Sequence, residues 1–352
     1  LYPKMMPCKN LTGVEQELLK MAGKEKKEIK GLIEEEGIVS FKTFMAYKGA
    51  LMIDDRQMIG LMEEVKKHGG IINVHATNGD MIDYLTQKHK DDGKLSPLYH
   101  YLSQPEVTEA EASERFVEMA NYTGCPGYIV HLTCEGALNA VRNATRRNQK
   151  VFVETCIQYL LLDASLYKND FEGAKWVMSP PLREKKDRVT LWAGINQGLV
   201  QVVATDHCPF KWEQKLMGKN DFSKIPNGHP AIENRMELLF SEGVNKGRIS
   251  LNKYVEVTAT NPAKIFGMFP RKGTIAVGSD ADIIIVDPNE KHIISAATHH
   301  MNVDYSGYEG WEVTGKVKTV LLRGKVAIDN NECFLKKGYG QFIKRKKVSQ
   351  NI

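Results

Sequence analysis

The sequence predicts an α/β protein built on a parallel sheet, followed by a small antiparallel β domain. Between about residues 36 and 206, short β-branched runs alternate with longer amphipathic segments, which is typical of βαβ units. These runs are also continuously apolar, so we expect both faces of the sheet to be covered. From about residue 272 to 328, apolar runs are separated only by Gly-Ser-Asp and Arg-Gly turns, which predicts the antiparallel domain.

The elements of both domains can be assigned in chain order. The parallel strands are expected in five apolar runs, at 37–45, 70–75, 128–131, 151–155 and 199–206. Helices are expected between them at 53–68 and 137–147, where the pattern is amphipathic. Residues 12–36 are rich in Glu, Lys and Leu and predict a helix with a charged face. The antiparallel strands are expected at 273–278, 281–287 and 317–328.

Composition excludes several classes of protein. The chain has 352 residues, of which 42% are hydrophobic and 26% charged, and this is typical of a soluble globular protein, not of a disordered or fibrous one. The formal net charge of +5 comes from interleaved acidic and basic residues, and the only dense basic run is 343–347. Because neither an aromatic platform nor a nucleic-acid motif accompanies this run, we expect a solvated tail and no nucleic-acid partner.

Cysteine usage and hydropathy predict the compartment. The six cysteines are scattered and form no CxxC pair, which favours reduced thiols over a disulfide framework. No apolar run is long enough to cross a bilayer, and the first residues, Leu1 to Lys4, lack the apolar stretch of a secretory signal. We therefore expect a cytoplasmic protein without a membrane partner.

Three of the expected strands end in a residue that can bind metal or move protons. His75 follows Ile-Ile-Asn-Val, His131 follows Tyr-Ile-Val, and Asp206 follows Val-Val-Ala-Thr. A lone histidine at a strand end is more often structural. Catalytic groups of parallel β/α proteins, however, gather at the carboxyl ends of the strands, so three such endings in one sheet favour a shared site.

Lys42 is anomalous because it lies inside an apolar strand. Unless it is paired or neutralised, a buried ammonium costs several kcal/mol. One interpretation is a lysine that reaches the end of the sheet or pairs with Asp206. The other is that burial lowers the pKa of Lys42, so that its neutral amine binds carbon dioxide and the resulting carbamate bridges two metal ions. The residues alone favour neither interpretation.

A series of short motifs resembles the dihydropyrimidinase and hydantoinase family of the amidohydrolase superfamily, in family order and from about residue 28 to the end. The motif around Lys42, Ser40-Phe41-Lys42-Thr43-Phe44-Met45-Ala46-Tyr47, resembles the carboxylated-lysine motif of that family. The other matching segments are 74–80, 131–133, 154–156, 179–183, 205–210, 225–228 and 273–282. The resemblance implies a (β/α)8 TIM-type barrel, incomplete at its N-terminal side here, and a small β-sandwich domain.

The resemblance also implies the chemistry of the site. Two divalent metal ions, most often zinc, would be bridged by carboxylated Lys42, with His75 and His131 on one metal and Asp206 on the other. The metals would lower the pKa of a water that attacks the ring amide, and Asp206 would act as the base that relays its proton.

Three further residues would hold the substrate, a small cyclic amide. Tyr47 would donate a hydrogen bond to the oxyanion, and Ser179 and Asn227 would hold the amide edge of the ring. Without the resemblance, Tyr47 would be interpreted as a rim aromatic and Asn227 as a turn residue.

These implications predict a function and a domain division. The expected reaction is the hydrolytic opening of a dihydropyrimidine or hydantoin ring to an N-carbamoyl amino acid. The predicted parts are an unmatched helical segment (1–27), a partial barrel with the metal site (28–268), a β-sandwich part (269–330) and a C-terminal tail (331–352). By analogy with the family, the chain would form a homotetramer through barrel helices and the tail.

One departure from the family pattern keeps alternatives open. The His-x-His pair that ends the first barrel strand in the family is absent from this sequence. We therefore expect the chain to be part of a longer hydrolase; if it were complete, the second metal would keep only the carbamate and Asp206, and hydrolysis would be weak. The alternatives are a non-catalytic scaffold like the dihydropyrimidinase-related proteins, or an allantoinase-like or dihydroorotase-like enzyme.

Overall fold

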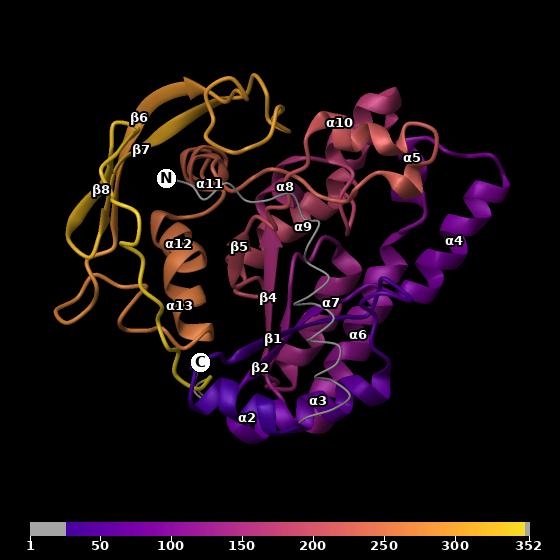
Figure 1. The fold of residues 1–352 in the computed structure, drawn as a ribbon, viewed down its shortest axis with the longest axis horizontal. Coiled ribbons are helices and arrows are strands. Elements are labelled where there is room, and N and C mark those ends of the chain that lie inside the picture. The colour runs from indigo at the N-terminus through magenta and orange to yellow at the C-terminus, as the bar shows by residue number, and fades with distance from the viewer. Residues whose placement is uncertain (1–25, 349–352) are drawn as a thin grey trace.

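The computed structural model describes residues 26–348, which contain two separate sheets (Figure 1). A parallel sheet has the order β1-β2-β3-β4-β5, with the bounds Ser40–Phe44, Ile71–His75, Gly127–Ile129, Val151–Cys156 and Val202–Ala204. An antiparallel sheet has the order β6-β7-β8-β9, with the bounds Ile283–Ile293, Glu312–Leu322, Lys325–Asp329 and Glu332–Cys333. The predicted fold class, a TIM-type barrel domain followed by a small β domain, is confirmed.

Helices connect the parallel strands and cover the sheet. Those before β5 are α2 (Lys26–Glu34), α3 (Asp55–His68), α4 (Gly79–Asp91), α5 (Pro97–Leu102), α6 (Glu106–Thr123), α7 (Glu135–Arg146), α8 (Ile157–Leu161) and α9 (Lys185–Asn196). Those after β5 are α10 (Trp212–Lys215), α11 (Arg235–Leu239), α12 (Leu251–Val255) and α13 (Asn261–Ile265). Helix α3 packs against α6, α6 against α7, and α7 against α9, which forms a continuous helical layer. Helix α11 packs against β7 of the second sheet.

Helix α3 illustrates how the sequence determines an element. Asp54 accepts a hydrogen bond from the Gln57 main-chain N–H, and the Gln57 side chain accepts one from the main-chain N–H of Asp54, which forms a capping box. The helix ends where Gly69 adopts a left-handed conformation with φ 83°. The predicted helix at 53–68 is therefore confirmed. Between Lys26 and Val348, no helix combines the length and apolar character that a bilayer span requires.

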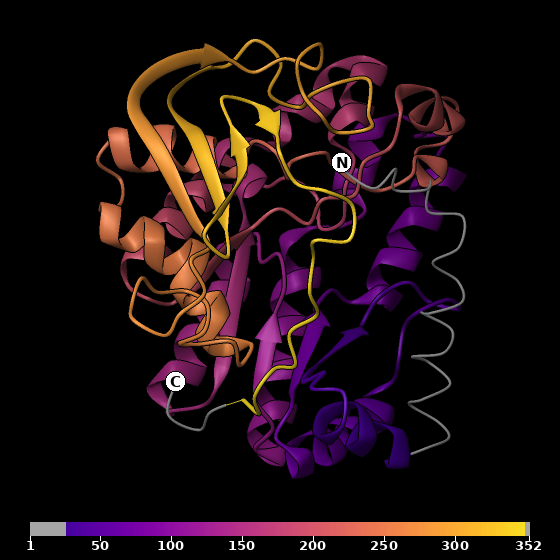
Figure 2. The ribbon, with the colours of Figure 1, turned by 60° about the vertical axis from the view of Figure 1, so that its left-hand side comes forward.

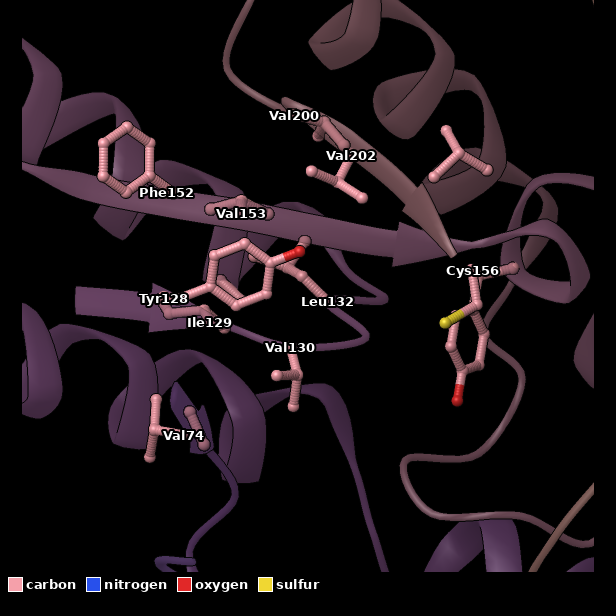
Figure 3. Packing of buried hydrophobic residues seen from close by; sticks show 14 of the residues in the cluster. Val74, Tyr128, Ile129, Val130, Leu132, Phe152, Val153, Cys156, Val200 and Val202 are labelled. Carbon is pink, nitrogen blue, oxygen red and sulfur yellow. The ribbon is translucent and has the colours of Figure 1, made fainter. Parts of the chain in front are cut away.

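The inner strands form the core of the parallel sheet. Figure 3 shows Ile129, Val153 and Val202 of adjacent strands packed together. Each of these side chains is less than 5% exposed, and burying such a side chain stabilises the fold by about 1.5–3 kcal/mol. Both faces of β2, β3 and β4 are largely buried, as the apolar runs predicted.

The prediction that both faces of every strand are covered is wrong for β1. Its residues alternate between partly buried and buried, and Ser40, Lys42 and Phe44 lie on the less buried face. Within the described sheet β1 is an edge strand, with β2 as its neighbour. Lys42 lies on the less buried face and is partly buried.

Two further predictions need correction or fall outside the described residues. The run 273–278 forms turns, because Gly273 and Gly278 adopt left-handed φ values of 82° and 92° and no strand among the described residues pairs with it. Ile275 of this run is 83% exposed. Helix α2 confirms the end of the charged helix predicted at 12–36, whereas its earlier part, and most of the predicted segment 1–27, lies outside the described residues.

The basic run near the C-terminus is docked against the protein through its main chain, while Lys344, Lys346 and Lys347 stay exposed, as predicted for a solvated run. After the antiparallel sheet the chain runs along the molecule to the amino ends of β1 and β2 (Figure 2). There the main-chain N–H groups of Arg345, Lys346 and Val348 donate to the carbonyls of three glycines, Gly37 (3.0 Å), Gly267 (2.9 Å) and Gly69 (2.9 Å). We call residues 344–348 the docked arm. A Cβ on Gly267 would lie 2.0 Å from the Lys346 carbonyl oxygen, so the close approach requires glycine.

Candidate active site

The structure brings the two predicted histidine ligands into contact. His75 is the last residue of β2, and His131 follows β3 by two residues. Because parallel strands run in the same direction, their carboxyl ends meet at one edge of the sheet. His75 Nδ1 lies 2.9 Å from His131 Nε2, and the two rings are nearly perpendicular. Both side chains are buried.

Three of the predicted site residues adopt a backbone conformation that is unusual for residues other than glycine. The φ angles of Tyr47, His131 and Asp206 are 64°, 43° and 46°. Each of the three follows the last residue of its strand by two or three positions. Left-handed conformations of this kind cost about 1–3 kcal/mol and cluster at functional sites. The positive φ values end the strands and turn these side chains at the open edge of the sheet.

Lys42 is coupled electrostatically to every other predicted ligand. Burial lowers the pKa of Lys42 to about 8, against the opposing effect of the Asp206 and Glu154 charges. Burial, with the added effect of the Lys42 charge, holds the pKa of His75 well below its ordinary value. The pKa of His131 is held well below its ordinary value too, first by burial. Both histidines are therefore neutral at physiological pH, which is the form that binds metal.

Asp206 lies at the mouth of the sheet, after the edge strand β5. Asp206 as a whole residue is exposed to solvent. The protein packed around its carboxylate nevertheless raises the pKa of Asp206, and the charge of Lys42 acts in the opposite direction. A carboxylate with a raised pKa accepts and releases protons more readily near neutral pH. Its position therefore suits a group that exchanges protons with a substrate.

The facing histidine nitrogens have the donor chemistry of a metal site. His75 Nδ1 and His131 Nε2 lie 2.9 Å apart, and imidazole nitrogens are common zinc ligands with bonds of about 2.0–2.1 Å. The other ring nitrogens, His75 Nε2 and His131 Nδ1, are buried without a hydrogen-bond partner in the described part of the chain, which is rare outside functional sites. Within residues 26–348, no three His, Cys, Asp or Glu side chains are grouped to hold a metal ion.

Glu154 is a residue of this site to which the sequence analysis assigned no role. It lies in β4, where its carboxylate accepts hydrogen bonds from the Tyr128 hydroxyl at 2.8 Å and from the His131 main-chain N–H at 3.3 Å. Burial raises the pKa of Glu154, while the Tyr128 hydrogen bond and the charge of Lys42 lower it. The signal that identified Lys42, a charged residue inside an apolar run, was equally present at Glu154.

The three predicted substrate residues line a single pocket beside the histidine pair. Tyr47, Ser179 and Asn227 all contribute to a pocket of about 240 Å³. The Tyr47 ring lies 5.1 Å from the His75 ring, which joins the pocket to the candidate metal site. The volume is below the range of about 300–1,000 Å³ that is usual for drug-sized ligands and suits a small ring.

Two further residues of this pocket were missed by the sequence analysis. The Ser179 hydroxyl donates to Gln104 Oε1 at 2.9 Å, and His100 Nε2 contacts the Met178 carbonyl oxygen at 2.8 Å. Both Gln104 and His100 line the pocket and are buried. No sequence motif marked them, since their position depends on the packing of α5 against distant segments.

The chain is similar to known proteins over most of its length. The model of the amidohydrolase family matches residues 10–327. The chain is 48% identical to a D-hydantoinase of Geobacillus stearothermophilus over 322 residues, which are 91% of this chain and 68% of that protein. It is 48% identical to a D-hydantoinase of Rhizobium radiobacter over 89% of this chain and 69% of that one. The crystal structure of dihydropyrimidinase from Brevibacillus agri superposes with a TM-score of 0.91 at 46% identity, over 92% of this chain and 71% of that one.

Proposed function

This chain belongs to the amidohydrolase family, and from this premise we propose that it hydrolyses the C–N bond of a cyclic amide. The substrate class is a hydantoin or dihydropyrimidine ring, which opens to an N-carbamoyl amino acid. The observation that carries the proposal is the contact of two buried, neutral histidines beside a small pocket lined by Tyr47, Ser179 and Asn227. The similarity to D-hydantoinases and a dihydropyrimidinase supports these rings over allantoin or dihydroorotate.

Four side chains would hold the metal of this family in the proposed site. His75 and His131 supply imidazole nitrogens, Asp206 supplies a carboxylate, and Lys42 supplies an anionic oxygen once its amine has become a carbamate. The lowered pKa of Lys42, about 8, supports this last role because carbon dioxide reacts with the neutral amine. Two divalent ions, zinc in preference, would provide Lewis-acid chemistry that polarises the amide carbonyl and lowers the pKa of water.

The remaining roles belong to the chain's own residues. Asp206 takes a proton from the attacking water, whose oxygen bonds to the ring carbonyl carbon, and it passes that proton to the ring nitrogen as the C–N bond breaks. Tyr47 donates a hydrogen bond to the oxygen on which negative charge develops. Ser179 and Asn227 hold the amide edge of the ring, so that the carbonyl carbon faces the metal ligands. The roles of Tyr47, Ser179 and Asn227 agree with the position of these residues in the pocket.

An assay of the purified chain tests the proposal. Loaded with zinc, the protein should convert hydantoin or dihydrouracil into the N-carbamoyl product, detected by chromatography. Asp206→Asn should lower kcat by about 10²–10⁴-fold, which is the usual size of a general acid–base contribution. The matched control is Asp92→Asn, at an exposed aspartate outside the pocket, which should leave kcat unchanged. A metal-loaded protein that opens neither ring would favour the non-catalytic scaffold.

Assembly and location complete the proposal. We propose a homotetramer by analogy with the family, and a location in the cytoplasm because the six scattered cysteines suit reduced thiols. Light scattering coupled to size-exclusion chromatography tests the assembly, and a monomer at micromolar concentration would contradict it.

A further inference from the structure

Lys215 is fully buried although its side chain ends in a basic amine. It is the last residue of α10 and has 0% exposure. Its Nζ donates hydrogen bonds to the carbonyl oxygens of Val177 (2.9 Å), Pro226 (2.7 Å) and Gly228 (2.9 Å). An ammonium has three N–H donors, so each donor of Lys215 has one acceptor.

The three carbonyls belong to the two segments that carry the proposed substrate residues. Val177 lies two residues before Ser179, while Pro226 and Gly228 are the neighbours of Asn227 on either side. The Gly228 main-chain N–H also donates to the Val177 carbonyl at 3.0 Å, so the two segments touch directly. Lys215 itself is not among the residues that line the pocket.

Packing alone does not explain a lysine at this position. Burial lowers the pKa of Lys215 to about 7, and among the described residues no carboxylate lies within ion-pair distance of its Nζ. Methionine would fill the same space without desolvating an amine. The three carbonyl dipoles, together with the Phe210 ring 5.5 Å from Nζ, are what makes the ammonium acceptable here. Lys215 therefore adds contacts to both segments beyond the single main-chain hydrogen bond from Gly228 to Val177.

We propose that Lys215 is a positioning residue for the ring-opening reaction, fixing the main chain of 177–179 relative to that of 226–228. The proposal rests on the function proposed above, because these segments hold the amide edge of the ring. Lys215 contacts neither the substrate nor the metal ligands. It acts by keeping Ser179 and Asn227 at the separation that one small ring requires, and its loss should weaken substrate binding more than chemistry.

Two variants and a control test the kinetic consequence. In Lys215→Met the three donors are removed at nearly constant volume, and Lys215→Gln keeps two N–H donors. For dihydrouracil, KM of the Met variant should rise at least tenfold, equivalent to about 1.4 kcal/mol, while kcat falls less than threefold and zinc content is unchanged. The Gln variant should lie between wild type and Met. Lys219→Met, at an exposed lysine four residues on, should match wild type. A folded Lys215→Met protein with KM within twofold of wild type would overturn the proposal.

Hydrogen exchange on the unmodified protein provides a measurement that needs neither folding of the variants nor turnover. If one ammonium holds both segments, peptides covering 177–179 and 226–229 should open together and exchange with similar protection. If the protection factors of the two segments differ by more than tenfold, the proposal that Lys215 holds them together is overturned. A wild-type chain without ring-opening activity would refute the proposed function, while exchange compared between wild type and Lys215→Met would still decide whether Lys215 adds to the Gly228–Val177 hydrogen bond in joining the segments.

Discussion

Replacing Arg183 by methionine should destabilise the protein strongly, because Arg183 is half of a buried ion pair. Its guanidinium lies 3.0 Å from Glu109 Oε2, and the two side chains are 4% and 2% exposed. Arg183 Nε also donates to Thr133 Oγ1 at 2.9 Å, and another guanidinium N–H donates to the Gln104 carbonyl oxygen. The pair thus joins the segment of Ser179 to that of His131.

The expected loss can be worked out from these contacts. Removing one partner of a buried pair costs about 3–5 kcal/mol, since the other charge remains buried and unpaired. Glu109 keeps hydrogen bonds from the Thr133 main-chain N–H at 2.7 Å and from the Thr133 hydroxyl, which reduces the penalty. The two lost hydrogen bonds add about 0.5–1.5 kcal/mol each. We expect the free energy of unfolding to fall by about 4 kcal/mol.

Urea unfolding followed by tryptophan fluorescence measures this loss. The matched control is Lys186→Met, which breaks an exposed pair with Glu106 at 3.5 Å and should cost less than about 1 kcal/mol. Adding Glu109→Gln to Arg183→Met removes the unpaired charge and should recover about 1–2 kcal/mol. If Arg183→Met costs no more than Lys186→Met, the buried pair does not stabilise the fold in the way argued here.

Three other perturbations have definite expected outcomes. Burial lowers the pKa of His100 from 6.5 to about 4, so between these pH values the unfolded chain binds a proton that the folded protein does not. The free energy of unfolding should therefore decrease by about 1.4 kcal/mol for each unit that the pH falls within this window, and urea titrations of His100→Gln should show a slope reduced by that amount. An unchanged slope would argue against burial as the cause. Gly267→Ala should lower the melting temperature more than Gly310→Ala, since both glycines have positive φ (72° and 78°) but only Gly267 would clash with the docked arm; equal shifts in calorimetry would contradict the clash. Chelation should abolish ring opening, and zinc should restore it in the wild type but not in His131→Asn; elemental analysis showing full metal content in His131→Asn would exclude this ligand.

The parallel sheet could be predicted because its strands carry a strong local signal. All five predicted runs overlap the observed strands, and the predicted helix at 53–68 has both its caps in the sequence. The runs predicted for β3 and β5 extend past the observed strands, to 131 and 206, whereas the strands end at Ile129 and Ala204. His131 and Asp206 adopt left-handed φ values that stop the strands before them, and nothing in an apolar run predicts such a turn.

The candidate site was predictable only in part. The apolar pattern placed His75 and His131 at neighbouring strand ends, and parallel geometry then brings them together. Lys215 and Gln104 could not be found in this way, because each acquires its partners from segments far along the chain. The docked arm is a similar case, since its basic sequence is ordinary for a solvated segment and its main chain binds to glycines that carry no side-chain signal.

The three glycines under the docked arm come from distant parts of the sequence, yet one short segment depends on all of them. Gly37 precedes β1, Gly69 precedes β2, and Gly267 follows α13. A first substitution that lifts the arm also removes the contact at the other two sites, so later substitutions there would cost only their own backbone strain. The order in which such changes are acquired therefore sets how harmful each one is, and a lineage that has lost one of these glycines is freer to lose the rest.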